Sequence, residues 1–218
     1  MKLADTFDLV LLEKAFTESV KEELSKHPLL KDKVQDIKEG VEQSEIQALV
    51  DNHVAVGLYQ NDELVGCVKR AHEYDKNLSA HVLLENLSTK ASGVVALMNL
   101  FKDNDINPDD VEYIIECSEE AIGDMNQRGG GNLAKSVGEV VGLKNASGID
   151  MRGFCAGPSH SLINAAALVK SGIYKNVVVV AGGCTAKLGM NGKSHVEKNL
   201  PALEDCLGGF AVLISEND

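Results

Sequence analysis

Hydrophobic residues in the first fifty positions recur with the spacing of an amphipathic helix. A first run has Glu and Lys between its apolar positions and is followed by Pro28, which predicts a helix that ends before the proline. Its apolar positions are Phe7, Val10, Leu11, Phe16, Val20 and Leu24. A second set, from Val34 to Leu49, predicts one or two further short helices with a charged, solvated face. We therefore interpret residues 1–50 as a helical segment.

The next segment has the pattern of a β-hairpin. His53 to Gln60 and Glu63 to Lys69 are two strand-like runs, and Asn61-Asp62 between them is typical of a turn. We interpret residues 51–87 as this hairpin followed by a connector.

Residues 88–218 alternate between helical patterns and short apolar runs, as in a layered α/β domain. Gly142 and Gly172 stand where helices commonly end on glycine, and Asn107-Pro108 turns the chain before the first strand. Val177 to Val180 is an unbroken apolar run, typical of a central strand covered on both faces, so we predict a mostly parallel sheet. The predicted elements are helix 88–103, strand 111–117, helix 132–141, strand 148–152, helix 158–171, strand 176–182 and strand 208–215.

Composition and charge argue against several classes of function. The chain has 218 residues, of which 44% are hydrophobic, so it can bury a core. Its net charge of −12 argues against binding to nucleic acid, which requires clustered Lys and Arg. No apolar stretch reaches the length of a membrane span, and Met1 to Asp8 lacks the basic start and apolar block of a signal peptide. We expect a cytoplasmic protein that binds neither nucleic acid nor membrane.

Five cysteines are spread along the chain without a paired pattern. They are Cys67, Cys117, Cys155, Cys184 and Cys206. Their odd number and wide spacing suggest neither a disulfide framework nor a zinc site, so we expect reduced thiols and no metal. A reducing compartment would keep a reactive thiol available.

Cys155 stands where a strand passes through a tight turn into a helix. Gly153 and Gly157 flank it, and Pro158 can open a helix because its missing N–H costs nothing there. A thiol at a helix N-terminus lies near unpaired amides and the positive end of the helix dipole, and both favour the nucleophilic thiolate. Small neighbours such as Gly157 would let an acyl group approach backbone amides that can hold an oxyanion. Cys155 is therefore predicted as the nucleophile, the alternative being a small buried residue.

Several other residues could border the same site. His160 follows Cys155 by five positions and could approach the thiol, or it could have a packing or capping role. Cys184 ends a strand and could line the same pocket, or it could simply allow close packing. Arg152 and Arg128 could meet an anionic group, or they could be solvated surface residues.

The remaining candidates are interpreted as structural. The glycine-rich stretch from Arg128 to Asn132 precedes a helix, but it has neither the order nor the lysine of a P-loop, and no GxGxxG pattern. We interpret it as a flexible loop. Cys67 and Cys117 lie in or beside strands and are predicted core residues, and Cys206 is interpreted as a turn residue.

An ordered set of motifs between residues 88 and 215 resembles the first half of the thiolase superfamily, most closely ketoacyl synthase III. The motifs are Phe154-Cys155-Ala156-Gly157, Lys170-Ser171-Gly172, Val177 to Val180 and Gly208-Gly209-Phe210-Ala211-Val212-Leu213. The resemblance implies a layered α/β fold with a mostly parallel five-stranded sheet and helices on both faces. Residues 88–218 would then be a thiolase-like N-terminal half-domain that carries the nucleophilic Cys155.

A narrower set of residues resembles the beta subunits of component C of the glycine/sarcosine/betaine reductase complex. The set consists of Gly153 to His160, Met125 to Asn132, Asp8 to Lys14 and His27 to Leu30. In that family the role is to take an acetyl unit from a carboxymethylated selenoprotein A and to help release it as acetyl phosphate. The resemblance implies the other component C subunits and selenoprotein A as partners, and an acyl thioester or selenoether as donor. It also implies phosphate as a candidate acceptor and no tightly bound cofactor.

Two features depart from the thiolase pattern. Thiolase-type catalysis uses a second half-domain that supplies His, and Asn or a second Cys, whereas this sequence stops after the last strand of the first half. The usual first strand is also absent before helix 88–103. We therefore expect a fragment of a longer subunit, or a chain completed by a partner in a homo- or hetero-oligomer. Three functions stay open: acetyl transfer in a glycine reductase complex, condensation by a ketoacyl synthase III-like enzyme, and a noncatalytic scaffold.

Overall fold

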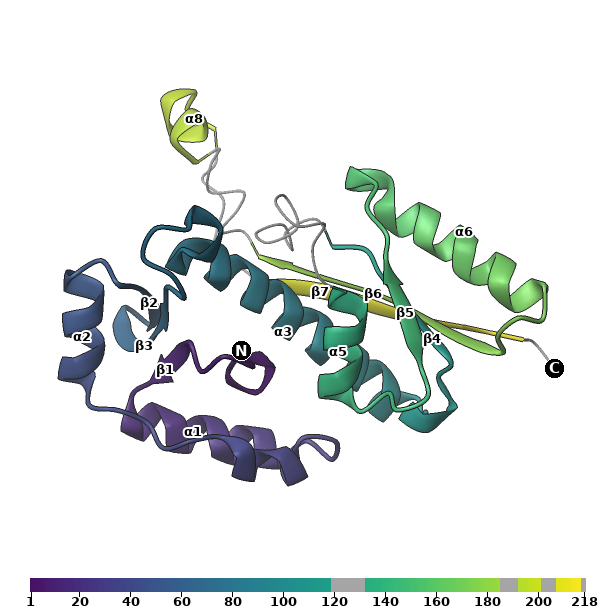
Figure 1. Ribbon diagram of the computed structural model, residues 1–218, viewed down its shortest axis with the longest axis horizontal. Coiled ribbons are helices and arrows are strands. Elements are labelled where there is room, and N and C mark those ends of the chain that lie inside the picture. The colour runs from purple at the N-terminus through teal and green to yellow at the C-terminus, as the bar shows by residue number, and fades with distance from the viewer. Residues whose placement is uncertain (119–131, 185–191, 201–206, 217–218) are drawn as a thin grey trace. The chain divides into compact units, whose positions relative to one another are not determined.

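The computed structural model describes residues 1–118, 132–184, 192–200 and 207–216 (Figure 1). The chain divides into two compact units, Met1–Leu87 and Ser88–Asp218. Helix α3, Ala80–Asp103, contains the boundary between them. None of the described helices is both long enough and apolar enough to cross a bilayer.

The first unit is built on a three-stranded antiparallel sheet in the order β1-β3-β2. Its strands are β1, Val10–Leu12; β2, Ala55–Gln60; and β3, Glu63–Lys69. Strands β2 and β3 form the predicted hairpin. The turn residues Asn61 and Asp62 both have left-handed φ angles, 50° and 65°, as a two-residue type I′ turn requires.

Helices pack on both faces of this sheet. Adjacent residues of β3 point to opposite faces, so Val68 joins the apolar cluster of α1, Lys14–Ser25, while Cys67 joins that of α2, Gln43–Asp51. The one or two short helices predicted between Val34 and Leu49 correspond to the end of a 3₁₀ turn and to α2. The 3₁₀ turns of this unit are Lys2–Ala4, Lys31–Asp36 and Lys76–Leu78.

The predicted helix through residues 7–24 is wrong for its first half. Val10–Leu12 is a strand in which Val10 lies opposite Val68 of β3. Leu11 packs on the α2 side of the sheet, and its two neighbours pack on the α1 side. All three positions are therefore apolar, and an unbroken apolar run matches part of a helical pattern as well as a strand. Helix α1 begins only at Lys14, where the Glu13 carboxylate accepts a hydrogen bond from the Phe16 amide at 2.8 Å.

The second unit has a four-stranded sheet in the order β5-β4-β6-β7. Strand β4, Tyr113–Glu116, is parallel to β5, Ser147–Asp150, and to β6, Asn176–Cys184, while β7, Leu207–Ser215, is antiparallel to β6. Its described residues form the second part of α3, α5 (Leu133–Val141), α6 (Gly157–Lys170) and α8 (Gly192–Glu197). They also form the 3₁₀ turns Pro108–Asp110 and Phe154–Ala156.

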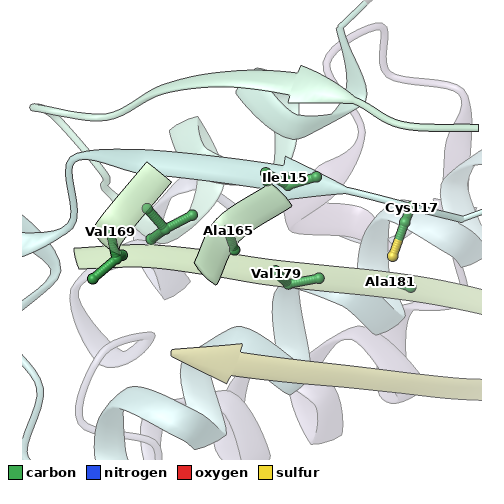
Figure 2. Packing of buried hydrophobic residues seen from close by; sticks show 7 residues of the cluster. Ile115, Cys117, Ala165, Val169, Val179 and Ala181 are labelled. Atoms are coloured by element: carbon green, nitrogen blue, oxygen red, sulfur yellow. The ribbon is translucent and has the colours of Figure 1, made fainter. Parts of the chain in front are cut away.

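Helices lie on both faces of this sheet, with α6 on one side and α5 on the other (Figure 1). Ala165 and Val169 of α6 pack on Ile115 and Val179 of the sheet, as Figure 2 shows. The apolar cluster there consists of Ile115, Cys117, Ala165, Val169, Val177, Val179 and Ala181. The predicted fold class, α/β with a mostly parallel sheet and helices on both faces, is confirmed, although the described residues supply four strands rather than five.

Helix α3 approaches the sheet most closely at a glycine of β6. A Cβ atom at Gly182 would lie only 2.0 Å from the Thr89 carbonyl oxygen and 2.5 Å from Ser92 Oγ. Two serine hydroxyls then accept the β6 amides: Ser118 Oγ from Gly182 at 2.8 Å and Ser92 Oγ from Gly183 at 3.0 Å. The end of β6 is thereby held between α3 and the segment that follows β4.

The element boundaries predicted for residues 88–218 differ from the observed ones by at most two residues, except at the start of α3. That helix begins at Ala80, eight residues before the predicted position, and Leu83, Leu84 and Leu87 of its first turns join the apolar core of the first unit. The predicted glycine at the end of α5 is confirmed, because Gly142 has a left-handed φ of 94°.

Candidate functional site

Cys155 lies in the turn between β5 and α6, as the sequence predicts. It is the central residue of the 3₁₀ turn Phe154–Ala156, and α6 follows at once with Pro158 in its first turn. Its thiol is exposed, whereas Cys67 and Cys117 are buried. In the described structure Cys155 is therefore not part of the buried core.

The turn is closely packed against the ends of β4 and β5. Gly157 is buried, and a Cβ atom there would lie 3.4 Å from the Cys117 carbonyl oxygen and 3.9 Å from that of Met151. A Cβ atom at Gly153 would be 3.3 Å from the Gly157 backbone. The two glycines thus let the backbone fold back on itself, and Gly157 faces the sheet.

Phe154 adopts an unusual conformation beside the cysteine. Its φ angle is 51°, in the left-handed region that side chains larger than glycine rarely occupy, and its side chain is 83% exposed. A conformation of this kind costs of order 1 kcal/mol and persists only where the surrounding contacts fix it. The turn that presents Cys155 is therefore held in place by its neighbours.

The first turns of α5 and α6 differ in how their amides are used. In α5, Asp150 accepts hydrogen bonds from Leu133 N at 2.8 Å and Ala134 N at 2.7 Å. Asn132 Oδ1 accepts from Lys135 N at 2.7 Å. No side chain of the described residues caps α6, which begins at Gly157, two residues after the cysteine.

These contacts bear on the glycine-rich stretch that precedes α5. Residues 128–131, including Arg128, lie outside the described residues. The amides at the start of α5 would be the natural anion site of such a loop, but Asp150 and Asn132 already accept from them. A phosphate cradle at the start of α5 is therefore disfavoured.

Arg152 is neither free nor simply solvated, because two carboxylates share its guanidinium. Nη1 donates to Glu116 Oε2 at 2.7 Å, and Nη2 lies 3.5 Å from Asp150 Oδ2. Glu116, the last residue of β4, is 1% exposed, and its other oxygen accepts from Ser118 N at 2.7 Å. Burial raises the pKa of the Glu116 carboxyl, and Arg152 and Ser118 oppose that rise.

Sequence reasoning missed Glu116, Asp150 and Ser118. The available signal was an acidic residue at the end of each of two apolar strands, with an arginine two positions after the second. Parallel strands bring their carboxyl ends to one edge of a sheet, so these charges could have been expected to meet.

The other predicted residues divide into three groups. Cys117 is a core residue, as predicted; its Sγ donates to the Val180 carbonyl at 3.6 Å, and burial raises its pKa. His160 is exposed on α6, next to Gly153, and no hydrogen bond joins it to Cys155 in the described part of the chain. Cys184 ends β6, but its side chain lies outside what the structure describes, as does Cys206.

Comparison with known proteins gives a match over the whole of this chain. The chain is 62% identical, over all 218 residues, to the glycine/sarcosine/betaine reductase complex component C subunit beta of Peptoclostridium acidaminophilum, and spans 42% of that protein. Over 87 residues it is 31% identical to beta-ketoacyl-acyl-carrier-protein synthase III of Listeria monocytogenes, covering 40% of this chain and 26% of the synthase. No family model matches. The predicted resemblance to the component C beta subunit is confirmed.

Among solved structures, a cerulenin-bound variant of OleA from Xanthomonas campestris matches with a TM-score of 0.46. The identity is 16%, and the match covers 58% of this chain and 40% of OleA.

Proposed function

We propose that this chain carries the nucleophile of an acyl-transferring subunit, with Cys155 as the acyl carrier. The observation that supports this most directly is the exposed thiol in a strained turn immediately before α6. In the proposed step, the sulfur forms a bond to the acyl carbon of a donor thioester and the donor's carbon–sulfur bond breaks. The departing thiolate takes up the proton that Cys155 loses.

The start of α6 supports this chemistry electrostatically. Its first turn has no side-chain cap among the described residues, so no side chain offsets the positive end of the helix dipole. Two amides there already donate to carbonyls of the turn, Ala156 N to Gly153 O and Gly157 N to Phe154 O, so the support comes from the dipole, which favours a thiolate. The buried Gly157 contributes by letting the helix begin directly against the sheet.

Within this class, we propose acetyl transfer in a glycine reductase complex. The support is the 62% identity to a component C beta subunit. A carboxymethyl selenoether becomes an acetyl thioester only with two electrons and the loss of water. A thiol of the donor protein would supply the electrons by closing a selenenyl sulfide, while Cys155 takes the acetyl group. Attack by phosphate would then form acetyl phosphate and restore the Cys155 thiol.

The chain spans about two fifths of its relative, so other groups of the site would come from the rest of a longer protein or from a partner. We propose that a His, and an Asn or second Cys, enter from there, in an oligomer with the other component C subunits and selenoprotein A in the cytoplasm. Phe154 and Ile163 support such a contact, because they are 83% and 66% exposed beside the thiol and on α6.

A condensing enzyme is the second candidate, supported by the 31% identity to ketoacyl synthase III over 87 residues. Both candidates use Cys155 as acyl carrier and differ in the donor. A noncatalytic scaffold would not need an exposed, strained cysteine turn.

The experiment has two stages, each with its own control. Iodoacetamide at neutral pH should label Cys155 ahead of the other four thiols, as mapped by mass spectrometry, and Cys155→Ser should remove that signal. Incubation with carboxymethylated selenoprotein A, or with acetyl coenzyme A, should then add an acetyl group to Cys155. Acetylation from the selenoprotein alone favours glycine reductase, and acetylation from coenzyme A alone favours the condensing enzyme. Equal labelling of all five thiols without acetylation from either donor would sink the proposal.

A further inference from the structure

Glu116 forms hydrogen bonds at two points with the segment that leads from β5 to the cysteine turn. Its backbone carbonyl accepts from Met151 N at 2.7 Å, which continues the β4–β5 pairing one residue beyond β5. Its side chain accepts from the guanidinium of Arg152, the next residue, at 2.7 Å. The two residues that leave β5 toward Cys155 are thus both bound to one residue of β4.

The same arginine connects the turn to α5. Arg152 lies 3.5 Å from Asp150, whose two oxygens accept the amides of Leu133 and Ala134. Glu116, Arg152 and Asp150 therefore form one chain of contacts from β4 to α5. Arg152, the middle member of this chain of contacts, precedes Cys155 by three residues.

Stability alone does not account for this pair, in which the Glu116 side chain is 2% exposed and that of Arg152 is 28% exposed. Removing the Glu116 carboxylate from water costs several kcal/mol, and apolar residues of similar volume often give an equally stable core. Such pairs are retained in several proteins because they specify one conformation. The conformation at stake here is the turn in which Phe154 is left-handed and Cys155 exposed.

We propose that Glu116 and Arg152 are positioning residues, which act through the turn to hold the Cys155 sulfur where a bound acyl group can reach it. The inference rests on the proposed acyl transfer. It assigns Arg152 to the protein's own carboxylates and not to an anionic substrate. Small displacements matter at this point, because misplacing a reacting group by about 1 Å can lower a rate by about a hundredfold.

The test compares two reactions of the same sulfur in the full-length subunit together with its partner subunits, from which the proposed function draws the remaining groups of the site. Acetylation by acetyl coenzyme A, or by carboxymethylated selenoprotein A if only that donor serves, requires the sulfur to be aligned. Alkylation by iodoacetamide requires only that the sulfur be exposed. We expect Glu116→Gln to lower the acetylation rate by about tenfold or more while the alkylation rate is unchanged. Arg152→Lys, which keeps the charge but not the planar fork, should lie between the parent and Glu116→Gln.

Two controls make the result specific. Glu139→Gln removes an exposed carboxylate of α5 and should change neither rate. A double variant, Glu116→Gln with Arg152→Met, should be no slower than the slower of Glu116→Gln alone and Arg152→Met alone, because the residues act as one unit.

The possible failures are distinguishable. A parent chain whose Cys155 is alkylated but accepts no acetyl group from either donor overturns the proposed function, and the positioning role with it. A parent that is acetylated, with Glu116→Gln and Arg152→Lys acetylated at the same rate, overturns the positioning role alone. Equal losses of acetylation and alkylation in both variants indicate a general structural role and also overturn it.

Discussion

Among the glycines that the structure describes, Gly182 is the one at which an added Cβ atom would lie closest to a neighbouring atom. The substitution Gly182→Ala places a Cβ atom 2.0 Å from the Thr89 carbonyl oxygen, 2.5 Å from Ser92 Oγ and 2.7 Å from Gly93 N. Ordinary contact of a Cβ atom begins near 3.4 Å. Two of the three atoms belong to the backbone of α3, so no side-chain rotation relieves the clash. The helix or the strand must move by more than an ångström.

That movement breaks contacts as well as shifting atoms. The hydrogen bonds from Gly182 N to Ser118 Oγ and from Gly183 N to Ser92 Oγ lie at the same place. Overpacking costs about 1–3 kcal/mol, and each buried polar group left unpaired costs about 1–3 kcal/mol more. We therefore expect the free energy of unfolding to fall by about 3 kcal/mol or more, a large part of the stability of a typical domain.

The assay is urea denaturation of the parent, Gly182→Ala and Gly208→Ala, followed by circular dichroism. Gly208 lies one pair away on β7, opposite Gly183, and a Cβ atom there has nothing within 4 Å. Its substitution should change stability by less than about 0.5 kcal/mol, as usual for exposed sites. If Gly182→Ala were as stable as Gly208→Ala, the described packing of α3 on β6 would be refuted.

Three further predictions concern the edge of the sheet near Cys155. Asp150→Ala removes the acceptor of two α5 amides and should cost about 1–2 kcal/mol in urea denaturation, and the loss should be smaller for Asp150→Asn, which keeps one oxygen. Burial raises the pKa of Glu116, so the folded chain binds this proton more tightly than the unfolded chain. Its contribution to stability is therefore complete below the ordinary pKa of about 4.3 and is lost as pH rises through the raised value. The charged groups near the Glu116 carboxyl are Arg152, which opposes the rise in pKa, and Asp150, which contacts Arg152. The stability of the parent relative to Glu116→Gln should fall as pH rises above about 4.3, and a rise with pH would contradict the reasoning. Burial also raises the pKa of Cys117, so peptide mapping should find it alkylated at neutral pH only after denaturation.

The second unit was predictable because its strands carry a continuous signal. Val177 to Val180 are all fully buried, as an unbroken apolar run predicts for a strand covered on both faces. Gly142 and Pro158 marked the ends of helices through backbone chemistry that depends little on the rest of the fold. The turn that carries Cys155 followed from the same local signals.

The first unit was harder to predict because its strand β1 is three residues long and buried on both faces. Such a run has no alternation to separate it from a helix. The contact between Glu116 and Arg152 joins residues 36 positions apart, and it depends on a sheet order that the pattern does not encode. Local spacing could therefore locate the turn that exposes Cys155 but could not identify the contact between Glu116 and Arg152 beside it.

The N-termini of α5 and α6 differ in whether a described side chain offsets the helix dipole. Side chains of Asp150 and Asn132 accept the first amides of α5, whereas at the start of α6 the acceptors are backbone carbonyls, Gly153 O for Ala156 N and Phe154 O for Gly157 N. A carboxylate therefore offsets the positive end of the α5 dipole, and no described side chain does so for α6. Within the described residues, the end of β5 thus leads from a neutralised helix start to one whose dipole is not offset.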